Sequence, residues 1–468
     1  MRLEEIIKGT GAVIVRGSSG TEITSICSDS RKVAAGSLFI AVKGCDRDGH
    51  EFIDAAMEAG AAAAVSADRR ALALCADAFY GHPSRDLTLV GITGTNGKTT
   101  TVTLLYRLFK SLGYQCGLLS TIANYVGDKR SETANTTADP ITINSLLAEM
   151  VEAGCGYCFM EVSSIGAEQE RIAGLKFKAA IFSNLTHDHL DYHKTFAEYI
   201  RCKKLFFDNL DSDAVALINI DDRNGSVMVQ NTRARVATYS CRTMADHSCK
   251  VMEQSFEGML LKIDGTETWT RLIGEHNAYN ILAIYSTAVE LGSDPMEVLV
   301  GISKLGSAPG RLENIKGPRD ISVIIDYAHT PDAMVNVLKT LREIAPERQL
   351  ICLFGCGGDR DKTKRPEMAK AAEDWSDRIF VTSDNVRTEK AEDILSDIRK
   401  GFSVKGLAHS IFIADRREAI RTAILTAQDG ATILLAGKGH ETYQIIGHEH
   451  LHFDEREIVA ETFKSMTI

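Results

Sequence analysis

The chain has 468 residues, of which 44% are hydrophobic and 25% charged, and a formal net charge of −10 at pH 7. This length predicts about three domains. The negative charge argues against a broad nucleic-acid surface, because such surfaces need clustered lysine and arginine. Residues 1–15 contain two glutamates and no long apolar core, and the small-residue run 59–67 is too short to cross a bilayer. We therefore expect no signal peptide, no membrane insertion and a cytoplasmic location.

The first predicted domain covers residues 1–87 and is a small α/β unit. Its apolar runs predict strands at 37–42 and 62–66 and a helix at 51–59. From 88 to 309, strands alternate with helices, which predicts βαβ units and a mostly parallel sheet. The strands of this central domain are expected near 115–120, 157–162, 179–184 and 214–220.

A hinge is predicted at 308–310, where the sequence reads Ala-Pro-Gly. The third predicted domain, 310–468, repeats the alternation and is Rossmann-like, although it lacks a correctly spaced GxGxxG. Its expected elements are strands at 321–327, 349–354, 378–383 and 431–436 and a helix at 333–343. The predicted fold class is therefore α/β with three domains.

The most informative motif runs from Thr93 to Thr100, directly after the apolar run 87–93. A buried strand, a glycine-rich turn and a helix start together form a phosphate-binding loop, in which backbone N–H groups, a lysine and a threonine hydroxyl meet phosphate and Mg²⁺. Ile92 occupies the position of the first glycine in the general GxxxxGK[ST] pattern, so that pattern is missed by one residue. The alternative is an ordinary strand–helix turn.

Two polar segments follow later strands of the central domain. Glu161 ends one strand and is well placed to hold Mg²⁺, because ligands gather at the carboxyl ends of parallel strands; the alternative is a helix-capping acid. Residues 184–193 contain three histidines and two aspartates, which suits a divalent cation or phosphate.

Lys203 lies on the apolar face of a predicted helix, and Lys204 points about a quarter-turn away. A buried lysine loses solvation and shifts toward its neutral amine, which can take up CO₂ as a carbamate and ligate a metal. From spacing alone, a snorkelling lysine with its head in water is the favoured alternative.

Four charged segments follow the strands of the third domain, at 326–332, 358–361, 384–387 and 437–441. Together they suit a polar, zwitterionic ligand, since Arg387 can fork onto a carboxylate and Glu441 can receive an ammonium group. Other candidates are weaker. The isolated Cys155-x-x-Cys158 pair does not favour a metal or redox site, and the histidines 448, 450 and 452 are interpreted as one face of a surface strand.

These motifs resemble the Mur ligases, and within that family the MurE-type enzymes, which add the third amino acid to a UDP-N-acetylmuramoyl-dipeptide. The resemblance covers essentially the whole chain. It implies catalytic roles for Lys98, Lys203, His189 and Glu161, and magnesium ligation by Thr99, Glu161, His189 and carbamylated Lys203. It implies ATP binding by Gly94, Thr95, Asn96, Gly97, Lys98, Thr99, Thr100, Asn277, Asn280, Arg311, Asp326 and His329. It implies binding of the UDP substrate by Ser30, Thr136, Thr137, Ser163, Gln169 and Arg171. It implies binding of the incoming amino acid by Arg360, Asp384, Asn385, Arg387, Gly437 and Glu441.

The resemblance implies Mg²⁺ as cofactor, ATP as co-substrate, meso-diaminopimelate as the added amino acid and a monomeric state. Three residues depart from the family pattern: Ile165 replaces a histidine, Val386 the proline of Asp-Asn-Pro-Arg, and Cys202 a small residue. The alternatives are an L-lysine-adding MurE-type enzyme, a poly-γ-glutamyl-type ligase, and a muropeptide- or nucleotide-binding sensor without catalysis. Intact Lys98, Glu161, His189 and Lys203 argue against the sensor.

Overall fold

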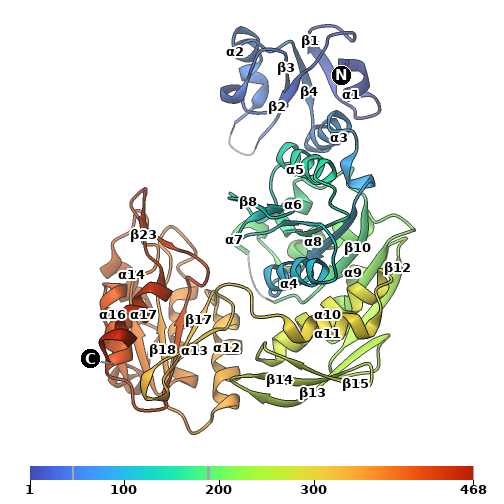
Figure 1. Ribbon diagram of the computed structural model, residues 1–468. Helices are drawn as coiled ribbons and strands as arrows, with labels where there is room; N and C mark the ends of the chain where they lie inside the picture. The colour runs from blue at the N-terminus through green and yellow to red at the C-terminus, as the bar shows by residue number, and fades with distance from the viewer. Residues whose placement is uncertain (45–46, 187–189, 467–468) are drawn as a thin grey trace. The chain divides into compact units, whose positions relative to one another are not determined.

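The computed structural model describes residues 1–44, 47–186 and 190–466 (Figure 1). The chain forms two compact units. The first comprises Met1–Leu185, Thr195–Tyr239 and Ala283–Val298. The second comprises the described residues of 186–194, 240–282 and 299–468. The elements confirm the predicted α/β class, whereas the boundaries near 87 and 309 stay predictions.

The N-terminal part of the first unit contains a four-stranded sheet in the order β1-β4-β3-β2. β2, β3 and β4 run parallel and β1 is antiparallel to β4. The bounds are Val13–Arg16 for β1, Ser25–Cys27 for β2, Ser37–Val42 for β3, Ala63–Ala67 for β4, Ile53–Glu58 for helix α2 and Arg69–Phe79 for α3. The predicted helix at 51–59 is split, because a 3-10 turn at Gly49–Phe52 precedes α2.

The central part of the first unit is a sheet in which β5 lies between β9 and β10. These strands run parallel, so their carboxyl ends meet at one edge and bring Thr93, Glu161 and Ser183 together. The parallel strands are β5 (Thr88–Thr93), β6 (Cys116–Leu119), β9 (Tyr157–Glu161), β10 (Phe177–Phe182), β11 (Val215–Asn219) and β12 (Arg235–Ser240). Helices alternate with these strands along the chain, among them α4 (Lys98–Ser111), α5 (Pro140–Glu152), α6 (Ser164–Glu168) and α8 (Phe196–Asp208). Two antiparallel strands follow β6, namely β7 (Asn124–Val126) and β8 (Lys129–Ser131).

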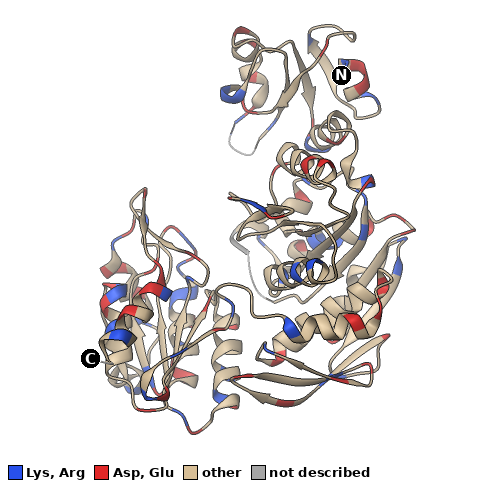
Figure 2. Ribbon diagram, in the orientation of Figure 1, with Lys and Arg blue, Asp and Glu red and all other residues tan. Residues whose placement is uncertain are grey.

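The second unit contains a six-stranded sheet in the order β16-β17-β21-β18-β19-β20, parallel except for β16. Its strands are β16 (Glu313–Lys316), β17 (Ser322–Asp326), β18 (Leu350–Phe354), β19 (Arg378–Val381), β20 (Ser410–Phe412) and β21 (Thr432–Ala436). Its helices include α12 (Pro331–Ile344), α13 (Lys364–Trp375), α14 (Ala391–Arg399), α16 (Arg416–Leu425) and α17 (Glu455–Ser465). Basic and acidic residues are interspersed on these helices (Figure 2). The predicted strands are confirmed to within a few residues.

An antiparallel meander in the second unit was not predicted. It consists of β13 (His247–Ser255), β14 (Gly258–Ile263) and β15 (Thr266–Thr270). Asp264 and Gly265, both with positive φ, connect β14 to β15. An Asp-Gly pair between short strands is a strong hairpin signal, which the expected βαβ alternation obscured. No helix in the described part of the chain is long and apolar enough to cross a membrane.

Candidate active site

The phosphate loop joins β5 to α4. Gly97 caps α4 with φ 87°, a left-handed conformation that favours glycine. Gly94 has φ 151°, and a Cβ there would lie 1.9 Å from the Ser183 hydroxyl. The Lys98 ammonium donates to the carbonyls of Gly94 at 2.9 Å and Thr95 at 2.8 Å. The helix N-terminus and the lysine therefore place positive charge around one glycine-rich turn.

The residues after β10 hold this loop in place. The backbone N–H groups of Thr95 and Asn96 donate to the Asn184 carbonyl and side-chain oxygen, both at 2.9 Å. The Ser183 hydroxyl donates to the Asn96 carbonyl at 2.7 Å. Sequence reasoning assigned no role to Ser183 or Asn184. The sequence feature that could have identified them is their position directly after β10, a parallel strand beside β5.

Glu161 lies beside the loop threonine. One carboxylate oxygen accepts a hydrogen bond from the Thr99 hydroxyl at 3.0 Å and the other from the Thr121 N–H at 2.8 Å. Glu161 is 1% exposed and does not cap a helix; Ser163 caps α6, so the capping alternative is wrong. Two adjacent hard oxygen ligands suit Mg²⁺. Within the described residues no group of three or more His, Cys, Asp or Glu forms a metal cluster, and His189 lies outside them.

Lys203 is 1% exposed, so the prediction that its head reaches water is wrong. Its Nζ donates to the Gly94 carbonyl at 2.8 Å and lies 4.7 Å from the centre of the Tyr199 ring. The Tyr199 hydroxyl in turn lies 3.1 Å from the Thr95 hydroxyl. Lys204 forms an ion pair with Asp208 on the same helix. Lys203 therefore contacts the phosphate loop from α8, and its carbamylation stays a prediction.

Most of the residues expected to bind the UDP substrate form one connected cluster. Arg171 donates to the Thr137 carbonyl at 2.6 Å and to the Gln169 side-chain oxygen at 2.8 and 3.1 Å. The Thr137 hydroxyl donates to the Glu161 carbonyl and accepts from the Ser163 N–H, both at 2.9 Å. This cluster thus adjoins the metal-binding candidates.

Two further residues are expected at the UDP substrate, and one of them, Thr136, connects to that network through Thr121, whose N–H donates to Glu161. The Thr136 hydroxyl accepts a hydrogen bond from the Thr121 hydroxyl at 3.1 Å. Ser30 begins a 3-10 turn, Ser30–Lys32, whose cap Asp29 accepts from the Arg31 N–H. The Arg31 side chain also lowers the pKa of Asp29 to about 2.

The remaining ATP candidates belong to the second unit. Asn277 and Asn280 lie on α10 (Glu275–Glu290), where Asn280 donates to Asn277 at 2.9 Å and Asn277 to the Ile273 carbonyl at 2.8 Å. Asp326 ends β17, accepts from the N–H groups of Leu312 and Ala328, both at 2.8 Å, and has its pKa raised by burial.

Arg311 lies over the Tyr327 ring at 4.9 Å. The same ring contacts His329 at 4.7 Å and His440 at 5.0 Å between ring centres. Burial and the charge of Arg311 lower the pKa of His440 to about 3, and burial raises the pKa of Tyr327 to about 12. Both rings are therefore neutral at neutral pH. Sequence reasoning assigned no role to Tyr327 or His440, although both lie in polar segments that it singled out.

The residues expected to bind the amino acid meet at the carboxyl ends of β18, β19 and β21. Glu441 accepts hydrogen bonds from Asn385 at 2.9 Å and from Lys438 at 3.0 Å, and burial raises its pKa. Lys438 has no exposed surface and lies 4.0 Å from Asp384. A Cβ on Gly437 would come 2.7 Å from the same carboxylate. Sequence reasoning assigned no role to Lys438, although it lies in the charged segment 437–441 that was singled out directly after a strand.

Two of the predicted residues, Arg387 and Arg360, lie near Gly357. Arg387 has φ 51° and donates to the Gly358 carbonyl at 2.9 Å. A Cβ on Gly357 would lie 3.0 Å from an Arg387 nitrogen and 3.6 Å from the Arg360 side chain. Val386 is buried. The structure thus assembles all six predicted residues from three separate segments.

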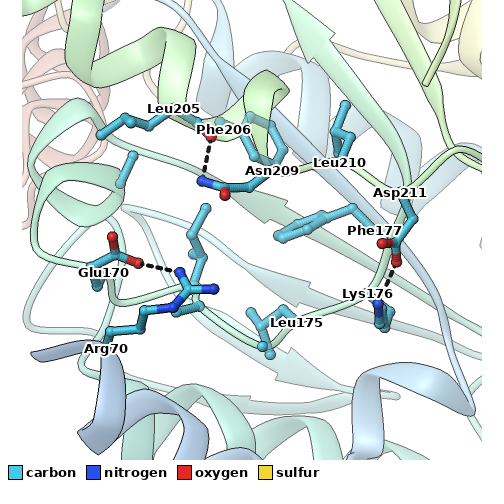
Figure 3. Close-up of a pocket in the computed structure, with 14 residues that line it drawn as sticks. Arg70, Glu170, Leu175, Lys176, Phe177, Leu205, Phe206, Asn209, Leu210 and Asp211 are labelled. Atoms are coloured by element: carbon cyan, nitrogen blue, oxygen red, sulfur yellow. Dashed lines mark hydrogen bonds and ion pairs between the residues drawn. The ribbon is translucent and has the colours of Figure 1, made fainter. Parts of the chain in front are cut away.

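A cavity of about 210 Å³ lies elsewhere in the first unit, at the start of β10. Figure 3 shows two ion pairs at it, Arg70 with Glu170 and Lys176 with Asp211. It contains no predicted site residue. The start of β10 is the edge opposite the phosphate loop, because the loop follows the carboxyl end of the parallel strand β5.

The structure also locates the cysteine pair and the C-terminal histidines, which were the weaker candidates. Cys155 and Cys158 are both buried thiols whose pKa values are raised by burial. The predicted surface strand is confirmed for His450 and His452 as β23 (Glu449–His452), which is exposed throughout, whereas His448 lies in the turn before it.

Comparison with known proteins gives three family matches in succession: the Mur ligase family catalytic domain at 22–93, the Mur ligase middle domain at 92–288 and the Mur ligase glutamate ligase domain at 310–439. A protein of Cytophaga hutchinsonii named UDP-N-acetylmuramoyl-L-alanyl-D-glutamate--2,6-diaminopimelate ligase is 49% identical over the whole of both chains. One of the same name from Parabacteroides distasonis is 48% identical over 99% of each. A solved structure of that ligase has 31% identity and a TM-score of 0.72, covering 100% of this chain and 99% of the other. The chain therefore belongs to the Mur ligase family.

Proposed function

We propose that the protein is an ATP-dependent ligase that adds meso-2,6-diaminopimelate to UDP-N-acetylmuramoyl-L-alanyl-D-glutamate in peptidoglycan precursor synthesis. Full-length relatives at 46–49% identity carry the name of this reaction. The observation that carries the proposal is the cluster of the buried Asn385 and Lys438 with the half-buried Arg387 and Glu441, which combines groups for a carboxylate and an ammonium. We also propose that it acts as a cytoplasmic monomer.

The phosphate loop would bind ATP and direct its terminal phosphoryl group to the D-glutamate carboxylate, which forms an acyl phosphate. The Lys98 ammonium and the first N–H groups of α4 stabilise the negative charge of the phosphates. Thr99, Glu161 and carbamylated Lys203 would hold Mg²⁺, which offsets further phosphate charge. The amine of the amino acid then attacks the acyl carbon, and phosphate leaves.

The far end of the amino acid distinguishes the two MurE-type substrates. Diaminopimelate carries a carboxylate and an ammonium there, whereas L-lysine carries an ammonium alone. Arg387 offers a planar fork to a carboxylate and repels a bare ammonium. Glu441 and Asp384 provide the negative charge that the distal ammonium requires. This chemistry favours diaminopimelate over L-lysine.

Folylpolyglutamate synthase from Mycobacterium tuberculosis has a similar structure, with a TM-score of 0.63, 20% identity and 77% of this chain covered. At that identity the likeness concerns the fold alone. The Asp29-Ser30-Arg31 segment and the Asp384–Arg387 segment favour the muropeptide ligase over a poly-γ-glutamyl ligase.

Phosphate release from ATP tests the proposal, measured with purified UDP-dipeptide and either meso-diaminopimelate or L-lysine. Wild type should use diaminopimelate far better. Arg387→Ala should lose that advantage and still form the acyl phosphate, detected as ATP-dependent trapping of the UDP-dipeptide by hydroxylamine. A preference of wild type for L-lysine would contradict the assignment of Arg387, and absence of any turnover would favour a binding sensor.

A further inference from the structure

Two fully buried charges lie in the second unit at the ends of α16 and α17. Arg416 is the first residue of α16 and Glu455 the first residue of α17, and neither side chain has exposed surface. The Arg416 Nε donates to Glu455 Oε1 at 2.8 Å. A buried ion pair of this kind rarely adds stability, since a well-packed apolar pair is often at least as stable. Its presence therefore calls for another explanation.

The other two guanidinium nitrogens bind backbone. Nη2 donates to the Ala436 carbonyl at 2.8 Å, and Nη1 donates to the Ser383 carbonyl at 3.3 Å. Ala436 ends β21 and directly precedes Gly437; Ser383 directly precedes Asp384. One side chain thus holds the carbonyls that directly precede two of the three segments of the amino-acid site.

The two carbonyls are not on neighbouring strands. β18 lies between β21 and β19, and α16 packs against all three. The Arg416 fork therefore spans the end of β18. The backbone segments that follow β18 and β19 pack closely there, because a Cβ on Gly355, just after β18, would lie 2.5 Å from the Thr382 carbonyl oxygen. A small shift of either carbonyl would move Asp384 relative to Gly437.

We propose that Arg416 is a positioning residue for the amino-acid substrate, with Glu455 fixing the direction of its fork. Arg416 sets the separation between the segment of Asp384 and Arg387 and the segment of Lys438 and Glu441. The planar guanidinium bonds the carboxylate and the two carbonyls through three different nitrogens in a fixed fork, whereas a lysine ammonium carries its donors on one nitrogen at the end of a flexible stem. This inference rests on the proposed function, because its ligand is the amino acid of that reaction.

Two variants separate positioning from folding. Arg416→Lys keeps a buried cation beside Glu455 and loses the fork. The double variant Arg416→Met with Glu455→Leu removes both charges and fills the space with apolar groups. The control is Arg417→Met, the next residue on α16, which is exposed and pairs with Glu461 at 3.0 Å. The measurements are Tm and the KM values for meso-diaminopimelate and for the UDP-dipeptide, each with the other substrates saturating.

Both Arg416 variants should fold and raise the KM for diaminopimelate about tenfold or more, because small misplacements of binding groups are costly. The KM for the UDP-dipeptide and all values for Arg417→Met should stay close to wild type. Folded variants with an unchanged KM for diaminopimelate would overturn the proposal, and so would failure of both variants to fold. Wild type is assayed in parallel: if it does not ligate diaminopimelate, the proposed function itself fails.

Discussion

The proposed phosphate loop and the proposed amino-acid site differ in how they present charge to a ligand. The loop combines seven consecutive residues, 94–100, with the backbone N–H groups of one helix start. Its anchors Asn184 and Ser183 are neutral, and the buried Lys203 and Glu161 contact it from neighbouring elements. The amino-acid site uses three separate segments and buried formal charges, with Lys438 bonded to Glu441 and Asn385. Phosphate is a dense anion that backbone N–H groups can recognise. A zwitterion needs charges of both signs at fixed separations.

The largest expected effect tests whether Lys203 serves the loop as a carbamate. Lys203→Ala should reduce turnover below detection, because it removes a buried group bonded to the Gly94 carbonyl and the proposed magnesium ligand. Added short carboxylates such as formate or acetate should partly restore activity. Lys204→Ala is the matched control on the same helix and should keep most activity in the phosphate-release assay. Equal losses in both variants would contradict the assignment.

A second large effect concerns the charge at the loop itself. Lys98→Ala should cost about 3 kcal/mol of transition-state stabilisation, the scale of one preorganised donor, which lowers kcat by about 10²–10³. Affinity for the UDP-dipeptide, measured by calorimetry, should change little. Near-normal turnover would refute the role of the loop, and a large loss of UDP-dipeptide affinity would show that Lys98 acts in binding.

The difference between a contiguous loop and a site built from separate segments also explains which features could be predicted from the sequence. The strand–turn–helix context of the predicted phosphate loop could be read from the sequence because its parts are contiguous, and the position of Glu161 beside Thr99 because Glu161 ends a neighbouring parallel strand. Asn184, Tyr199 and Lys438 received no individual role from the sequence, although Asn184 and Lys438 lie in segments that it singled out, because their roles depend on contacts across the fold. For Lys203, helical spacing predicted that the side chain lies on the apolar face, but it could not predict where the amine ends. The structure buries that amine against the Gly94 carbonyl. The meander β13–β15 was missed because regular alternation before and after it outweighed a local Asp-Gly signal.

A third, smaller effect uses pH to test the charged site. Burial raises the pKa of Glu441 above the ordinary value of 4.5, so its carboxylate takes up a proton at a higher pH than an ordinary glutamate. The protonated form cannot pair with the distal ammonium. The KM for diaminopimelate should therefore rise as pH falls through that raised pKa, by about 10–100-fold for one charged hydrogen bond of 1.5–3 kcal/mol.

Glu441→Gln should remove this pH dependence and hold the KM for diaminopimelate high at every pH. Glu457→Gln is the control, because Glu457 is exposed and pairs with His452 on the surface. Steady-state assays across the acid range, with ATP and UDP-dipeptide saturating, measure both. An acid limb that persists in Glu441→Gln would assign the titration to another group.

The smallest expected effect concerns Val386, at a position where the resemblance to the family implies a proline. Val386 is 8% exposed, and among the described residues its backbone N–H makes no hydrogen bond that a proline would remove. The following Arg387 already has its left-handed φ of 51° and donates its own N–H to the Ile445 carbonyl at 3.1 Å. Val386→Pro should therefore restrict the unfolded chain and raise stability by about 0.4–1 kcal/mol.

Thermal unfolding measures that gain, and the KM for diaminopimelate shows whether the turn was already in place. We expect a Tm higher by a few degrees at most and a KM within about twofold of wild type, because the Arg387 side chain is held independently by the Gly358 carbonyl at 2.9 Å. A lower Tm would mean that the backbone at 386 lies outside the φ that proline imposes. A marked fall in KM would mean instead that valine leaves the arginine partly misplaced, so that this turn, and not only the buried charges, sets the affinity of the site.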